Sequence, residues 1–133
     1  MIKIDTKQVL KMHDMLIREI GGKDGVMNFG LLKSALGAPF QTFGGQELYP
    51  TIEQKAARLC VGLINNHAFY DGNKRIGVLT FLTFLETNDV KVSFTDKELI
   101  DIGLNIASGK MDVEELTDII NVHKPLESDC VLS

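Results

Sequence analysis

The stretch NKRIGVLTFLTFLE, residues 73–86, decides the fold because its residues suit a helix that is apolar on nearly every face. Such a helix is stable only where other elements surround it, so we place it at the centre of the molecule. Its apolar part, residues 76–85, contains two threonines and has about half the length of a membrane span. The stretch therefore predicts a buried helix and not a transmembrane segment.

Helix signals lie on both sides of this central stretch. Five further helices are predicted from their cap residues, and four of them begin with a capping box. The caps are Asp5 to Gln8, Asn28, Thr51 to Gln54, Thr95 to Glu98 and Asp112 to Glu115. Residues 90–94 alternate and look extended, and residues 40–49 predict a hairpin because Gly44 and Gly45 lie in their middle. The sequence thus predicts a mostly α fold, a compact helical bundle with a small β-hairpin.

Length and charge limit the organisation and the partners. The 133 residues contain no internal repeat or linker, so we expect one domain over residues 1–124 and a flexible C-terminal tail over 125–133. A net charge of −4 argues against direct binding of nucleic acid. The N-terminus lacks the apolar region of a signal peptide, so we expect no membrane partner and a cytoplasmic protein. Cys60 and Cys130 lack the spacing of a disulfide framework or a zinc site.

The segment HAFYDG, residues 67–72, connects the preceding helix to the central helix. Lys74 and Arg75 fall in the first turn of the central helix, where cations are unfavourable beside the positive end of the helix dipole. A bound polyphosphate would resolve this conflict, because helix N-termini donate N–H groups to anions. Asp71 suits a Mg²⁺ ion that bridges two phosphates. His67 suits a base that takes a proton from an attacking hydroxyl.

Plainer roles for these residues stay open from the residues alone. A histidine at the end of a helix is often a C-cap or a surface residue, and residues 71–75 also suit a solvated turn with a surface salt bridge. Cys60 falls on the apolar face of a helix, where a buried inert thiol is expected. His13 and His123 have no chemically matching neighbours in the sequence, so we assign both to structural or surface roles.

The pattern H-x-F-x-D-G-N-K-R at residues 67–75 resembles the signature of Fic-domain proteins, in particular the Doc (death-on-curing) branch of toxin–antitoxin systems. Further similar parts are GG-x-x-G at 21–25, GLLKSALGAP at 30–39, FGGQELYPT at 43–51 and FLETN at 84–88. The resemblance therefore extends over about residues 21–88. It implies a Fic-like helical bundle whose hairpin is a flap that aligns the target protein by strand addition.

The resemblance also implies a role for each residue of the site. His67 takes the role of general base, and Asp71 that of the Mg²⁺ ligand. The residues implied to form the anion pocket and hold the phosphates of ATP are Gly72, Asn73, Lys74 and Arg75. The flap residues implied to bind the target are Phe40, Thr42, Phe43, Gly44, Gly45, Gln46 and Leu48.

By the same resemblance, the protein is expected to be a type II toxin that transfers the γ-phosphate of ATP to a hydroxyl of a protein. Translation elongation factor Tu is the implied target, so translation and growth would stop. AMP-transferring relatives usually have glycine where Lys74 stands and a second arginine where Val78 stands, which favours phosphate transfer. AMP transfer to a protein hydroxyl stays an alternative, as does a nucleotide-binding regulatory module without catalysis.

We expect a separate protein to inhibit the activity of this chain. Relatives that inhibit themselves carry a glutamate followed by glycine or asparagine, and no glutamate of this chain is followed by either residue. We therefore expect a cognate antitoxin with a segment that folds on docking and covers the ATP site.

Overall fold

The computed structural model describes residues 1–125 and confirms a mostly α fold with a small hairpin. Its elements, in chain order, are α1 (Thr6–Ile20), α2 (Phe29–Gly37), η1 (Ala38–Phe40), β1 (Thr42–Phe43), β2 (Gln46–Glu47), α3 (Ile52–Asn66), α4 (Asn73–Thr87), α5 (Asp96–Ala107) and α6 (Val113–Val122). Of the predicted tail over 125–133, all but Pro125 lies outside the described residues. None of the helices described over residues 1–125 is both long enough and apolar enough to cross a membrane.

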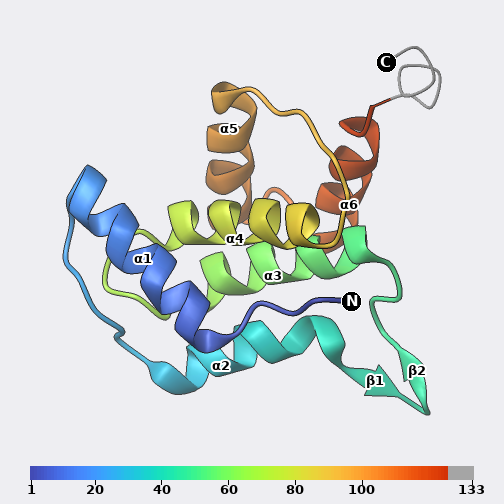
Figure 1. Cartoon of the computed structure of the whole chain (residues 1–133), viewed down its shortest axis with the longest axis horizontal. Coiled ribbons are helices and arrows are strands. Elements are labelled where there is room, and N and C mark those ends of the chain that lie inside the picture. The colour runs from blue at the N-terminus through green and yellow to red at the C-terminus, as the bar shows by residue number, and fades with distance from the viewer. Residues whose placement is uncertain (126–133) are drawn as a thin grey trace.

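The central position of α4 is confirmed. Figure 1 shows α3 and α4 side by side through the middle of the molecule, with α1 and α2 on one side and α5 and α6 on the other. The side chains of Ile76, Phe81 and Phe84 are completely buried in this core. Cys60 on α3 is buried too, and burial raises the pKa of its thiol well above the ordinary value, as expected for an inert thiol.

The predicted caps all form. Asp5, Thr51, Thr95 and Asp112 each make a complete capping box, and Asn28 accepts a hydrogen bond from the Leu31 amide. Each such cap stabilises its helix by about 1 kcal/mol, because it satisfies an N–H group that the helix itself leaves without a partner. The first residues of five helices are thus fixed by local sequence, whereas α4 has no side-chain cap.

A glycine allows α3 and α4 to approach closely. A Cβ atom added to Gly77 on α4 would lie 2.7 Å from Ile64 Cγ1 and 3.1 Å from the Cys60 carbonyl oxygen, both on α3. Contacts of this length do not fit a side chain without movement of one helix. Because Gly77 lies one turn after the start of α4, this contact also fixes the start of α4 relative to the end of α3.

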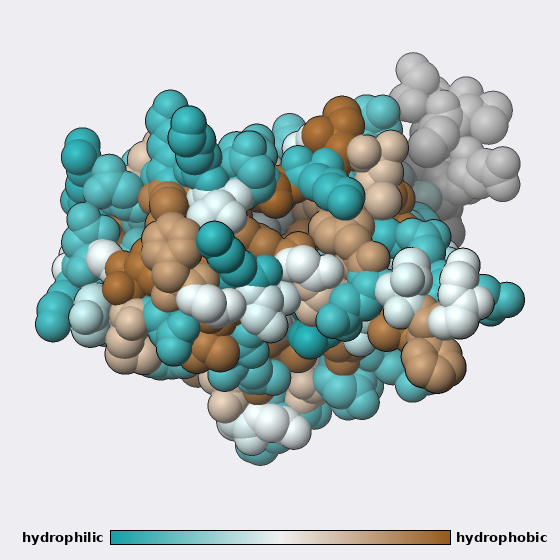
Figure 2. All heavy atoms as spheres, turned by 90° about the horizontal axis from the view of Figure 1, so that it is seen from below, coloured by the Kyte–Doolittle hydropathy of each residue, from teal (hydrophilic) through white to brown (hydrophobic). Residues whose placement is uncertain are grey.

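The hairpin is shorter than predicted. Thr42 pairs with Glu47 and Phe43 with Gln46, while Gly44 and Gly45 have φ angles of 59° and 81°, which suits a two-residue turn. Phe40 lies outside it, in η1, with its ring packed edge-on against Phe84. Both strands are exposed, and Figure 2 shows apolar groups among hydrophilic ones at the end of the molecule where the hairpin lies.

A buried lysine anchors the hairpin to the first turn of α3. Lys55 is only 1% exposed, donates to the Tyr49 carbonyl oxygen and pairs with Glu47 at 2.9 Å. A buried ammonium is costly unless it is paired in this way. Figure 1 shows the hairpin at the end of α3 opposite the loop that leads into α4.

His123 has the structural role predicted for it. Its ring stacks on Phe94 at 4.2 Å between centroids and hydrogen bonds to the Glu98 carboxylate and the Ile119 carbonyl oxygen. These contacts connect the end of α6 to the start of α5. Residues 90–94, which look extended in the sequence, are not part of any sheet in the described chain. The amide of Ser93 donates a hydrogen bond to the His123 carbonyl oxygen.

Candidate anion-binding site

The predicted loop between α3 and α4 is confirmed, and His67 begins it. His67 is the C-cap residue of α3 and has the left-handed conformation, with φ 50° and ψ 51°, which is uncommon for a residue other than glycine. Its side chain is exposed, and no described residue hydrogen bonds to its ring. The backbone of His67 thus ends α3, while its imidazole stays accessible to a substrate.

The interior of the loop is closed by Asn73. Phe69 is 1% exposed; its amide donates to Asn73 Oδ1 at 3.1 Å, and its carbonyl oxygen accepts from Asn73 Nδ2 at 2.9 Å. Both polar atoms of the Asn73 side chain are therefore used within the loop. The group that Asn73 offers an anion is its backbone N–H, and its side chain holds the loop in shape.

The segment after α1 packs along this loop. The Met27 amide donates to the Ala68 carbonyl oxygen at 2.7 Å, and the Tyr70 amide donates to the Gly25 carbonyl oxygen at 3.3 Å. The Lys23 amide donates to Asp71 Oδ2 at 2.6 Å. One carboxylate oxygen of Asp71 is thus held, and no hydrogen bond from a described residue reaches the other.

A cavity of about 450 Å³ opens where these two segments meet the start of α4. Its lining residues are Ile20, Gly21, Gly22, Asp71, Gly72, Asn73, Lys74 and Arg75. The N-cap of α4 is Gly72, whose φ of 80° suits glycine and which has no capping side chain. The first N–H groups of α4 lack helical partners, so they and the helix dipole favour an anion here. His67 does not line this cavity.

The cations at the start of α4 form no ion pair within residues 1–125. Lys74 and Arg75 are exposed, and neither forms an ion pair with any residue among 1–125. The surface salt bridge considered for residues 71–75 is therefore not formed. Two cations beside a positive helix end make the site complementary to a strongly charged anion.

The donor set fits a Mg²⁺ ion that is bound together with phosphates. Residues 1–125 contain no group of three or more metal-ligating side chains, so a metal held by the protein alone is not favoured. Mg²⁺ commonly binds through one or two carboxylates together with substrate phosphates and water. Asp71, with one oxygen held by Lys23 and the other without a hydrogen bond, suits this arrangement.

An apolar groove of about 730 Å³ lies beside the anion cavity. It runs between α1, α4 and α5, and its lining residues are Leu16, Ile20, Lys74, Arg75, Val78, Leu79, Leu82, Asp96, Leu99, Ile100, Gly103 and Leu104. The groove and the cavity share Ile20, Lys74 and Arg75. A ligand in the groove would therefore also contact the cations of the anion site.

Known proteins match this same region. A model of the Fic/DOC family matches residues 3–85. The chain is 35% identical over 98 residues to Toxin Doc of Mycolicibacterium smegmatis, which covers 72% of this chain and 75% of that protein. It is 29% identical over 117 residues to Protein kinase doc of Escherichia phage P1, and this match covers 88% of this chain and 91% of that protein.

Proposed function

Because the chain belongs to the Fic/DOC family, we propose that it is a toxin that transfers the γ-phosphoryl group of ATP to a hydroxyl of a protein. The observation that carries this proposal is the cavity at the uncapped start of α4, where Lys74 and Arg75 form no ion pair with any described residue. The name Toxin Doc of one relative supports the role of a toxin, and the name Protein kinase doc of the other supports transfer of phosphate to a protein. The target proposed is translation elongation factor Tu, whose modification would stop translation.

Each residue of the site has a defined part in this reaction. The imidazole of His67 accepts the proton of the target hydroxyl, whose oxygen bonds to the γ-phosphorus as the bond to the ADP oxygen breaks. The N–H groups at the start of α4, with Lys74 and Arg75, hold the phosphates by hydrogen bonds and charge. The carboxylate of Asp71 would hold Mg²⁺, which neutralises phosphate charge when bound.

Two residues favour transfer of the γ-phosphoryl group over transfer of AMP. The stem of Lys74 lies beside α5, where a Cβ on Gly103 would be 3.5 Å from Lys74 Cβ. Lys74 also lines the anion cavity, so it adds a positive charge there where glycine would leave space. Val78 offers the neighbouring groove an apolar group and no arginine. The site thus has no second arginine at position 78 to hold a departing pyrophosphate.

A cognate antitoxin is the proposed regulator. An amphipathic segment that folded into the groove between α1, α4 and α5 would bury apolar side chains and also cover Lys74 and Arg75. Expression of this chain alone is then expected to arrest growth, and co-expression of the antitoxin to restore it. Normal growth at high expression of the folded chain would contradict the toxin assignment.

Labelled ATP tests the reaction itself. The purified chain is incubated with elongation factor Tu and ATP that carries label on its terminal or its α-phosphate. We expect protein labelling from the terminal position only, and none with His67→Asn. Asparagine is the better replacement here because it tolerates the left-handed conformation of this residue, so the folded state is kept while the base is lost. A lost general base lowers rates by about 10² to 10⁴.

The matched outcomes separate the alternatives. Label from the α-phosphate would show AMP transfer, and Lys74→Gly then measures how far this residue determines the choice. Binding of ATP without transfer to any protein would favour the regulatory module. Arg75→Ala should weaken ATP binding measured by calorimetry, and an unchanged affinity would remove Arg75 from phosphate binding.

A further inference from the structure

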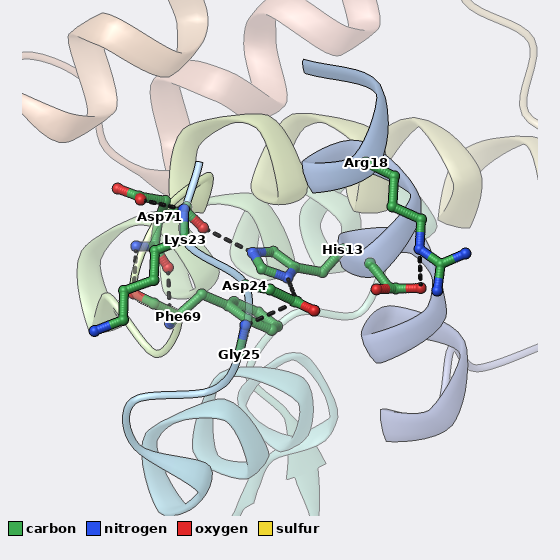
Figure 3. Close-up of polar contacts among 9 residues, drawn as sticks. His13, Arg18, Lys23, Asp24, Gly25, Phe69 and Asp71 are labelled. Carbon is green, nitrogen blue, oxygen red and sulfur yellow. Dashed lines mark hydrogen bonds and ion pairs between the residues drawn. The ribbon is translucent and has the colours of Figure 1, made fainter. Parts of the chain in front are cut away.

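His13 is a buried histidine that the reaction described above does not use. It lies on α1, 58 residues from Asp71 in sequence, and is 2% exposed. Its Nε2 lies 2.7 Å from the carbonyl oxygen of Asp71. Figure 3 shows the ring between the α3–α4 loop, which contains Phe69 and Asp71, and the segment that follows α1.

Three contacts fix the His13 ring. The ring stacks on Phe69 with centroids 3.8 Å apart and planes 15° apart. Because a carbonyl oxygen can only accept, Nε2 is the nitrogen that donates to Asp71. The other ring nitrogen, Nδ1, lies 3.9 Å from Asp24 Oδ1, which itself accepts from the Gly25 amide. The tautomer and the orientation of the ring therefore follow from its neighbours.

The same residue, Asp71, is thus held at both its backbone and its side chain. His13 binds the carbonyl oxygen, and the Lys23 amide binds Oδ2. The next residue is Gly72, the N-cap of α4, where an added Cβ would lie 3.5 Å from His13 Nε2. His13 therefore contacts the turn at which the Mg²⁺ carboxylate and the first N–H groups of α4 meet.

We propose that His13 is a positioning residue, which orients the Asp71–Gly72 turn by donating Nε2–H to the Asp71 carbonyl oxygen. Without this donor, the buried side of the turn loses a fixed contact, and the Asp71 carboxylate and the α4 amides no longer hold one arrangement. The consequence for phosphate transfer rests on the proposed function, whereas the effect on the turn does not.

Two variants separate the hydrogen bond from the packing. His13→Phe keeps an aromatic ring to stack on Phe69 but has no donor, and His13→Gln places an amide N–H near the position of Nε2. The first measurement is hydrogen exchange without ligand, at the Phe69, Tyr70 and Ile76 amides, all of which donate in this loop or the first turn of α4. We expect exchange to be about tenfold faster in His13→Phe, the factor for one lost hydrogen bond, and close to the parent in His13→Gln.

The second measurement is the affinity for ATP with Mg²⁺, by calorimetry. His13→Phe is expected to bind about tenfold more weakly and to need more Mg²⁺ for saturation, and His13→Gln to recover most of the loss. His123→Phe is the matched control, because His123 also stacks on a phenylalanine and bonds to a carbonyl oxygen, but lies between α5 and α6. It should leave both measurements unchanged.

Equal exchange in His13→Phe and the parent would overturn the proposal, as would exchange in His13→Gln as fast as in His13→Phe. If His13→Phe does not fold, His13→Met and His13→Gln give the same comparison, because they are similar in size and differ in the donor. A parent that binds no ATP would contradict the proposed function, while the exchange data would still decide the role of His13.

Discussion

Replacement of Gly77 by alanine should destabilise the protein, although alanine is the better helix former. In a helix interior this change alone would stabilise by up to about 1 kcal/mol. Here the new Cβ would lie 2.7 Å from Ile64 Cγ1 and 3.1 Å from the Cys60 carbonyl oxygen. Overpacking of this kind costs about 1–3 kcal/mol. We therefore expect a net loss of about 1–2 kcal/mol, and a Tm lower by roughly 3–8 °C for a domain of this size.

Urea unfolding followed by circular dichroism measures this loss. Gly37→Ala is the matched control, because it also lies in a helix, α2, but its added Cβ has no atom within 4 Å. It should be neutral or stabilise by up to about 1 kcal/mol. In the double variant Gly77→Ala with Ile64→Ala, the nearest obstructing atom is removed. The loss of stability in the double variant should therefore be smaller, by at least about 0.5 kcal/mol, than the sum of the losses in the two single variants.

The same change should affect the anion site, since it moves the start of α4 relative to the end of α3. Weaker ATP binding in a variant that is still folded would follow from this displacement. Equal stability of Gly77→Ala and the parent, with Gly37→Ala as expected, would show instead that α3 and α4 have room for a methyl group.

Three further predictions concern single contacts. Lys55→Met removes the partner of Glu47, so the hairpin amides should exchange faster, while global stability changes by no more than about 2 kcal/mol; unchanged exchange would show that the lysine is no anchor. Gly72→Ala should cost about 1 kcal/mol or more in thermal unfolding, because its φ of 80° is unfavourable for alanine. The hydrogen bond that the His123 ring donates to the Glu98 carboxylate raises the pKa of His123 above its ordinary 6.5, so this stabilisation is complete below pH 6.5 and is lost as pH rises through the higher folded-state value. The excess stability of the parent over His123→Phe, measured by urea unfolding, should therefore shrink as the pH is raised, and an excess independent of pH would contradict the pairing.

Local signals made much of the fold predictable. Each capping box joins residues three apart in sequence, so its pattern is visible without any tertiary contact, and the helix starts at Asp5 and Thr51 followed directly. The position of α4 followed from its apolar faces. The end of the hairpin nearest α2 was misplaced because Phe40, which looks like a strand residue, packs on Phe84 across the core.

The candidate site was predictable in its exposed part only. Lys74 and Arg75 lie together in the first turn of α4, where two cations conflict with the helix dipole, so these residues themselves point to an anion. The contact of His13 joins residues 58 apart, and a lone histidine on an amphipathic helix gives no signal of its partner. The burial of Lys55 was not predicted either, because a lysine is normally expected at the surface.

The length of α3 determines how far the hairpin lies from the imidazole of His67. Lys55 holds the hairpin near one end of this helix, and His67 follows its other end. His67 is twelve positions after Lys55 in the sequence (67 − 55), which corresponds to about 18 Å of helix axis at roughly 1.5 Å per residue. An extended chain that paired with the hairpin and reached His67 would need about five to six residues for that span. Deletion of a single residue would turn the imidazole by about 100° around the helix axis. If a target chain binds as proposed, the number of residues in α3 would determine which position of that chain meets His67.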